Sequence, residues 1–147
     1  MTSKVPKIAA AGFALTAVVA VLMVINLSGN QAASVTGDFR NAATAEVRDA
    51  QGKVWLRGTF AAATGNSDDV ERGATLTATP DGEQASGEAE IEYSKSKPNV
   101  QEIEFEVSGV PARAIMTLVI DGRDVISATA DDKGRAKAEF DVAVSPQ

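Results

Sequence analysis

The residues whose type and spacing could do chemistry are glutamates that recur at every second position in two neighbouring runs. Two carboxylates held about 5 to 10 Å apart can hydrolyse a glycosidic bond. Such work also needs a cleft that raises one pKa, and glutamates along a strand face supply none. We favour a solvated acidic surface and keep a small carboxylate-dependent hydrolase as the alternative. The residues are Glu88, Glu90, Glu92, Glu102, Glu104 and Glu106.

Two acidic loops are weak candidates for calcium, a hard cation that takes about six to eight oxygen ligands. One loop is NSDDVE at 66–71, and the other follows residue 130. Neither matches the D-x-[DN]-x-[DN]-G spacing of a calcium loop, so we expect no metal and no cofactor. The carboxylates concerned are Asp68, Asp69, Glu71, Asp131 and Asp132.

The sequence contains no histidine and no cysteine. Ser-His-Asp and Cys-His catalysis, histidine acid–base chemistry and the usual zinc and copper sites are therefore excluded. Disulfides are excluded too, so a hydrophobic core must hold the fold. We expect a protein that is not an enzyme.

An apolar segment from Ile8 to Leu27 contains no charged residue. A helix of this length spans the roughly 30 Å hydrocarbon core of a bilayer. Lys4 and Lys7 precede it, so the positive-inside rule leaves residues 1–7 in the cytoplasm. We expect a single-pass membrane protein with an extracytoplasmic C-terminal domain, in the periplasm or at the cell surface.

A cleavable signal peptide competes with this signal anchor. Its apolar region usually runs about 7 to 15 residues, and the nearest cleavage site, QAA at 31–33, begins with glutamine. We favour the retained anchor and keep secretion after cleavage as the alternative. Within the segment, Gly12, Thr16 and Ala20 recur every four residues and would form a face for close helix–helix approach in lipid.

The exported part is acidic, because all 20 acidic residues follow the apolar segment while two of the 14 basic ones precede it. Such a surface repels phosphate backbones, so nucleic acid is not an expected partner. Besides the membrane, we expect a protein or an envelope polymer as partner.

Residues 28–44 are small and polar and indicate a flexible linker. From 45 to 147, short alternating runs separated by turn residues are typical of an all-β domain. We predict an antiparallel β-sandwich of about eight strands, similar in size to an immunoglobulin domain. The predicted strands are Ala45 to Asp49, Lys53 to Ala61, Ala74 to Thr79, Gly87 to Ser94, Gln101 to Ser108, Ala114 to Ile120, Arg123 to Ala130 and Arg135 to Val144.

Turn residues support these strands. Asp121-Gly122 lies between two apolar runs, which is a strong hairpin signal. With the DDKG turn at 131–134, it predicts that the last three strands form an antiparallel meander.

Side chains alternate between the two faces of a strand, which explains the spacing of the glutamates: Ile91 faces the core, whereas Glu90 and Glu92 face water. If the two glutamate runs pair directly, like charges face each other at a cost. Arg135 and Lys137 alternate with alanines in the last predicted strand. We predict that this strand, or another basic one, lies beside an acidic strand.

Two further segments bear on the layout. The run AIMTLVI at 114–120 is apolar on both faces, which predicts a central strand or one whose outer face is covered. Alternation around Leu56 places Trp55 and Arg57 together on the opposite face. We favour packing of Trp55 beneath a loop or the linker, and keep Trp55 and Arg57, with the glutamates, as a possible interaction surface.

From Gln101 onward, the strings EIEFEVSGVP, TLVIDG and ATADDKGRAKAEF resemble exported bacterial β-domains related to the chordin-repeat (CHRD) family. Those domains show an alternating strand ending in V-x-G-L/V-P, then a V-D/N-G hairpin and a D-x-x-G turn. The histidine-containing segment typical of chordin repeats is missing here. The resemblance implies an exported β-sandwich and assigns no site residue.

Together these features predict a membrane-anchored extracytoplasmic β-sandwich that acts as a binding or structural module of the cell envelope, without catalysis.

Overall fold

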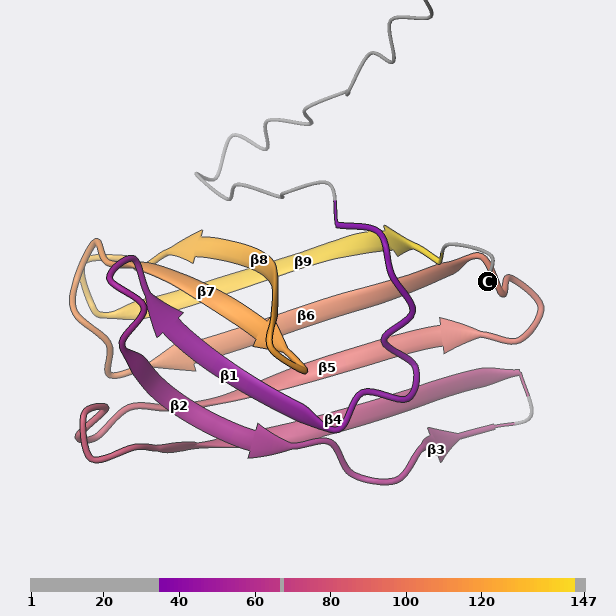
Figure 1. The fold of residues 1–147 in the computed structure, drawn as a ribbon, viewed down its shortest axis with the longest axis horizontal. Coiled ribbons are helices and arrows are strands. Elements are labelled where there is room, and N and C mark those ends of the chain that lie inside the picture. The colour runs from indigo at the N-terminus through magenta and orange to yellow at the C-terminus, as the bar shows by residue number, and fades with distance from the viewer. Residues whose placement is uncertain (1–34, 67, 145–147) are drawn as a thin grey trace, which may run out of the picture.

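Nine strands make up the part of the chain that the computed structural model describes, residues 35–66 and 68–144 (Figure 1). The prediction of an all-β antiparallel domain is confirmed. The apolar segment 8–27 and the helix face within it lie outside the described residues. Within them, no helix is long and apolar enough to cross a membrane.

Eight of the strands correspond to the predicted ones, with small differences at their ends. The two-residue strand β3 and the first half of β4 were not predicted, because the turn-forming residues Asn66 and Asp69 indicated a loop there. The strands are β1 (Thr44–Asp49), β2 (Val54–Thr59), β3 (Thr64–Gly65), β4 (Asp69–Ala78), β5 (Ser86–Ser94), β6 (Val100–Ser108), β7 (Ile115–Ile120), β8 (Arg123–Thr129) and β9 (Arg135–Ala143).

The strands form one sheet in the order β8-β7-β1-β2-β4-β5-β6-β9, with β3 paired to β4. In Figure 1, β1, β2 and β7 cross over β4, β5 and β6, so that the sheet folds back on itself in two layers. Within the described residues, the ladder between β2 and β4 has two pairs, Leu56 with Ala78 and Arg57 with Thr77. On the other side, β8 lies beside β9 without a ladder, which makes the shape nearly that of a barrel.

The predicted meander of the last three strands is wrong at its final step. β7 and β8 do form a hairpin, and Asp121 and Gly122 in its turn have φ of 47° and 80°. β9, however, pairs with β6 instead of β8. The turn at 130–134 therefore carries the chain from one edge of the sheet to the other. Pairing with β6 places Lys137 of β9 opposite Glu106, whereas β8 contains no glutamate.

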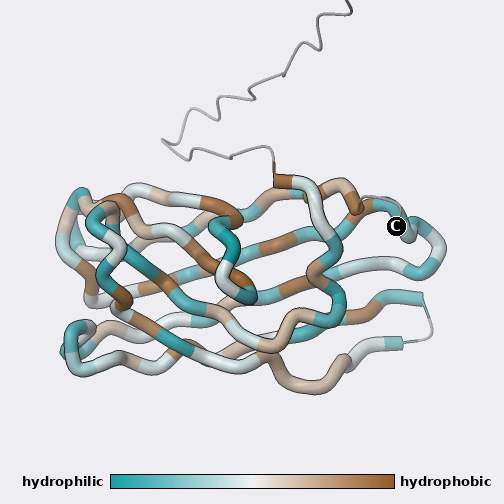
Figure 2. Tube along the Cα trace, in the orientation of Figure 1, coloured by the Kyte–Doolittle hydropathy of each residue, from teal (hydrophilic) through white to brown (hydrophobic). Residues whose placement is uncertain are grey.

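The inner faces of the two layers form a continuous hydrophobic core. Figure 2 shows the alternation of hydrophobic and hydrophilic residues along the strands that creates these faces. Phe105 of β6 is fully buried between Ala89 of β5 and Ala138 of β9. Small residues on both sides of a large one let neighbouring strands fill the core without strain.

β7 lies between β1 and β8, which confirms the central position predicted for the apolar run at 114–120. Met116, Leu118 and Ile120 belong to the core. Val119, on the opposite face, is also buried, with 1% of its surface exposed.

Residues 35–43, the second half of the predicted linker, pack against the sheet; we call this segment the strap. Phe39 and Ala42 are each 3% exposed and belong to the core. The side-chain amide of Gln101 accepts a hydrogen bond from the Phe39 N–H at 3.0 Å and donates one to the Gly37 carbonyl at 2.6 Å. The folded domain therefore includes the strap.

Candidate functional site

Carboxylates gather on the outer face of the layer formed by β4, β5, β6 and β9. The strand registers align residues of all four strands in common rows, so that the two glutamate runs pair directly. We call the carboxylates of these rows the acidic face. The first row is Glu71, Glu92, Glu102 and Asp141, the second is Gly73, Glu90, Glu104 and Glu139, and the third is Thr75, Glu88, Glu106 and Lys137.

β9 supplies the basic neighbour that the sequence predicts for an acidic strand. Lys137 stands opposite Glu106 in the ladder, and its ammonium group donates a hydrogen bond to Glu104 Oε1 at 2.6 Å. This hydrogen bond, with the charges of Glu104 and Glu106, raises the pKa of Lys137. Arg135, on the same strand, pairs with Asp131 at 3.2 Å. The basic residue of the face therefore stands in the third row.

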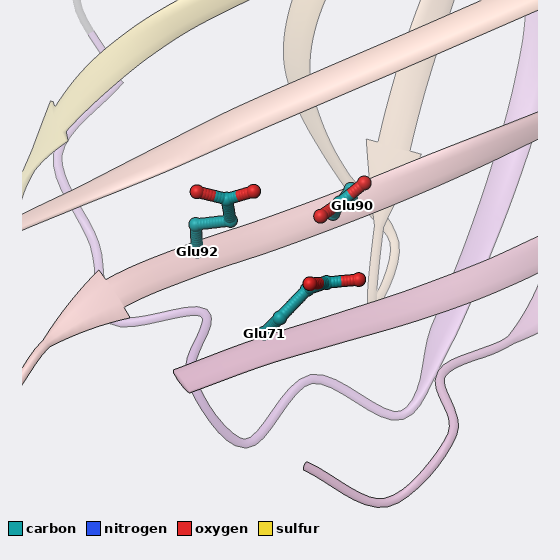
Figure 3. A group of neighbouring side chains, drawn as sticks. All are labelled: Glu71, Glu90 and Glu92. Carbon is teal, nitrogen blue, oxygen red and sulfur yellow. The ribbon is translucent and has the colours of Figure 1, made fainter. Parts of the chain in front are cut away.

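Three carboxylates converge where the first two rows meet on β4 and β5 (Figure 3). Oxygen atoms of Glu71, Glu90 and Glu92 all lie within 4.8 Å of one another. Gly73 stands opposite Glu90, and a Cβ added at Gly73 would meet nothing within 4 Å, so this side of Glu90 is open. Partial burial, then hydrogen bonding to Glu92 and repulsion from Glu71, raises the pKa of Glu90 to about 7.

The crowding of negative charge continues across the first row. Burial, followed by repulsion from Glu139, Glu92 and Asp141, raises the pKa of Glu102. The sheet itself holds these carboxylates in place, because each one alternates with a buried side chain on its own strand. The positions of the carboxylates on this surface are therefore set by the sheet.

A hollow of about 720 Å³ opens at the first-row end of the acidic face. All four carboxylates of the first row line it, together with three apolar or aromatic residues, Val70, Tyr93 and Val100, and with Lys97. Val100 is 42% exposed, which is unusual among the large apolar residues described. Apolar surface beside carboxylates suits a lysine or arginine side chain, whose stem is apolar and whose head is charged.

The chemistry open to this arrangement follows from its exposure. With one oxygen from each carboxylate, the three converging residues would supply at most half of the six to eight ligands that calcium takes. Acid–base hydrolysis requires a substrate enclosed against the carboxyl groups, whereas Glu71 and Glu92 are exposed. Attraction of positive charge over several rows requires neither a metal cage nor a closed cleft.

The calcium candidates near residue 130 serve the turn before β9. Asp131 Oδ1 accepts hydrogen bonds from the backbone N–H groups of Lys133 at 2.8 Å and Arg135 at 2.9 Å. Asp132 pairs with Arg113 at 2.9 Å. These carboxylates therefore stabilise a turn.

The other calcium candidates lie at the start of β4. The N–H groups of Asp68 and Asp69 both donate to Asn66 Oδ1, which shapes the loop before the strand. Glu71 extends onto the acidic face, where it meets Glu90. Sequence reasoning did not join these two residues, because it placed Glu71 in a loop.

Trp55 and Arg57 lie on β2, which flanks β4 on the side away from β5 and its glutamates. The indole N–H of Trp55 donates to Asp49 Oδ2 at 3.0 Å, and the Lys53 ammonium lies 4.7 Å from the ring centroid. Arg57 pairs with Glu46 at 2.9 Å. Both residues are thus held by partners within the β1–β2 hairpin.

Sequence reasoning missed Glu139 and Asp141 of β9, which complete the first two rows. The signal was present, because these residues alternate with Ala138, Phe140 and Val142 just as the glutamates of β5 alternate with its core residues.

No protein-family model matches the chain, and no curated protein or solved structure matches it either.

Proposed function

We propose that this protein is a membrane-anchored binding module of the cell envelope, whose β-sandwich domain lies outside the cytoplasm and recognises a cationic partner through the acidic face. The observation that carries the proposal is the first row, in which four neighbouring strands each contribute a carboxylate. Like charges opposite each other destabilise a sheet. A cation bound across the row offsets that repulsion, so binding and stability are linked.

The spacing of the face suits an extended basic polypeptide. Alternate residues of a strand lie about 6.8 Å apart, and Glu88, Glu90 and Glu92 follow this repeat. Lysines or arginines at alternate positions of a partner segment have the same repeat, so several ion pairs can form in register. The contact between Lys137 and Glu104 is an example within the chain.

The hollow would bind one particular end of such a segment, because it lies at one end of the acidic face. A lysine or arginine stem can lie against the exposed side chain of Val100 while its charged head meets the first row. The partner segment would then bind in one chain direction along the face, which charge alone would not specify.

The sequence supports the proposed location. The uncharged segment 8–27, with Lys4 and Lys7 before it, supports an N-terminal anchor with the domain on the outer side. A tagged chain digested with protease in intact cells and in lysed cells tests this location. Protection of the domain in intact cells of an organism without an outer membrane would contradict it.

Binding of the full chain to a peptide of alternating lysine and threonine, compared with a glutamate–threonine peptide, tests the acidic face. The variant Glu71→Gln/Glu92→Gln/Glu102→Gln should weaken binding about tenfold or more, and added salt should weaken it further. A control that removes the same charge away from this face is Asp124→Asn/Asp81→Asn/Glu83→Gln. Equal losses in the two variants would mean that net charge, and not this face, attracts the peptide.

A further inference from the structure

The strap is bound to the rest of the domain through its own backbone. Gln101 of β6, which is 1% exposed, bonds the strap backbone on both sides of Asp38. The guanidinium group of Arg72 on β4 donates to the carbonyls of Arg40 at 2.9 Å and Ala42 at 2.8 Å.

Two residues near the β7–β8 turn complete this set. Arg123 donates to the carbonyl of Thr36 at 2.9 Å. Asp121 accepts from the N–H groups of Ala43 at 3.0 Å and Thr44 at 2.8 Å. We call the side chains of Arg72, Gln101, Asp121 and Arg123 the strap groove.

One strap side chain supplies the apolar anchor. Phe39 is 3% exposed, and the guanidinium carbon of Arg123 lies 5.2 Å from its ring centroid. Among the described residues the strap joins no ladder, although the Gly37 N–H donates to the carbonyl of Ala143 at the end of β9 at 3.3 Å. Domains that bind extended peptides hold them likewise, through the peptide backbone and a pocket for an anchoring side chain.

We propose that the strap groove is a peptide-binding site that the strap fills as an intramolecular ligand, and that the groove also accepts the strap of a second copy of this chain. The ligand class is a segment with the pattern G-x-F, as in Gly37 to Phe39, followed by a turn at residues 40 and 41 in which the Ala42 N–H donates to the Phe39 carbonyl at 2.9 Å. A strap from another copy forms the same contacts, so exchange between copies changes few contact energies. The inference does not depend on the acidic face.

Two complementary variants of the full chain test the exchange. Phe39→Ala leaves the groove intact but removes the anchor of the strap. Gln101→Leu leaves the strap intact but removes both hydrogen bonds of Gln101. In a mixture, the intact strap of the Gln101→Leu chain can enter the intact groove of the Phe39→Ala chain. Size-exclusion chromatography should therefore show a heterodimer in the mixture that neither variant alone shows.

The matched control is a mixture of Phe39→Ala with the double variant Phe39→Ala/Gln101→Leu, in which neither chain carries an intact strap. A heterodimer in the first mixture and not in the second supports the proposal. Equal behaviour of the two mixtures overturns exchange between copies.

A fluorescent peptide with the sequence of residues 35–43 tests the groove directly. It should bind the Phe39→Ala chain at least tenfold more tightly than a peptide in which alanine replaces the phenylalanine. If Phe39→Ala unfolds the chain, the peptide should restore the β signal in circular dichroism. Neither binding nor recovery would overturn the groove as a peptide site.

Discussion

Lys137 bonds Glu104 at 2.6 Å, although the residue opposite Lys137 in the ladder is Glu106. The lysine therefore reaches diagonally, toward the second row, where negative charge is denser. Diagonal neighbours on adjacent antiparallel strands lie within reach of long side chains, and the charges of Glu104, Glu106 and Glu139 all act on Lys137. Removing Lys137 should therefore increase the repulsion between carboxylates in both the second and the third row.

Lys137→Gln should lower the melting temperature at low ionic strength, by roughly 2 to 4 °C, because the repulsion between glutamates of β6 and β9 is then less balanced. The deficit should shrink in molar salt, which screens exposed charges. Thermal unfolding at both ionic strengths checks this, with Lys95→Gln in the β5–β6 loop as control. A deficit that salt leaves unchanged would point to packing rather than charge.

Glu90→Gln should make stability less dependent on pH. The fold raises the pKa of Glu90 from its ordinary value of 4.5 to about 7, so the fold favours the protonated group. Its contribution to stability is complete below pH 4.5 and is lost as the pH rises through about 7. After allowance for solvent screening, we expect Glu90→Gln to be more stable than the natural chain by about 1 kcal/mol at pH 8, and equal to it at pH 4.

Urea unfolding followed by the fluorescence of Trp55, the single tryptophan, measures both free energies. Glu88→Gln is the control, since it lies on the same strand in the third row. That variant should stay within about 0.5 kcal/mol of the natural chain at either pH. A Glu90→Gln curve parallel to that of the natural chain would show that Glu90 does not titrate in this range.

The sequence predicted eight of the nine strands and the glutamates of β5 and β6, because both depend on local alternation, but it missed β3, the first half of β4 and the carboxylates that β4 and β9 add to the acidic face. Glu90 and Ile91 must face opposite ways in any strand, whatever the neighbours are. The local sequence of a strand does not specify which other strand it pairs with. The position of β9 depends on whether Phe105 fits against Ala138 and whether Lys137 meets glutamates, and both facts involve residues far apart in the chain.

The strap escaped prediction for a related reason. Phe39 is the one aromatic residue in a stretch of mostly small and polar ones, so no period marks the segment. Its structure comes from Arg72 and Gln101, which stand at inward-facing positions of β4 and β6, opposite Ile91 and Tyr93 of β5. A polar residue at a core position is the signal that could have indicated a bound segment.

Asp121→Ala should destabilise the domain by about 2 kcal/mol, because Asp121 combines a positive φ with acceptance of two N–H groups at the start of β1. Asp121→Asn should cost less than about 1 kcal/mol, since asparagine tolerates the left-handed region and keeps an acceptor oxygen. Urea unfolding of both variants makes the comparison. Equal losses would mean that the negative charge matters more than the turn.

Alanine substitutions at two strand glycines, Gly58 and Gly73, should change stability in opposite directions, because the space around the two residues differs. A Cβ at Gly58 of β2 would lie 2.4 Å from the carbonyl oxygen of Thr75 on β4, whereas a Cβ at Gly73 would meet nothing within 4 Å. Gly58→Ala must push apart two backbones beside the short β2–β4 ladder, and should cost about 1 to 3 kcal/mol. Gly73→Ala should gain about 0.4 to 1 kcal/mol, because alanine restricts the unfolded chain. Urea unfolding of the two variants compares the same chemical change at both positions, and equal effects would contradict the close approach of β2 to β4 that joins the two layers.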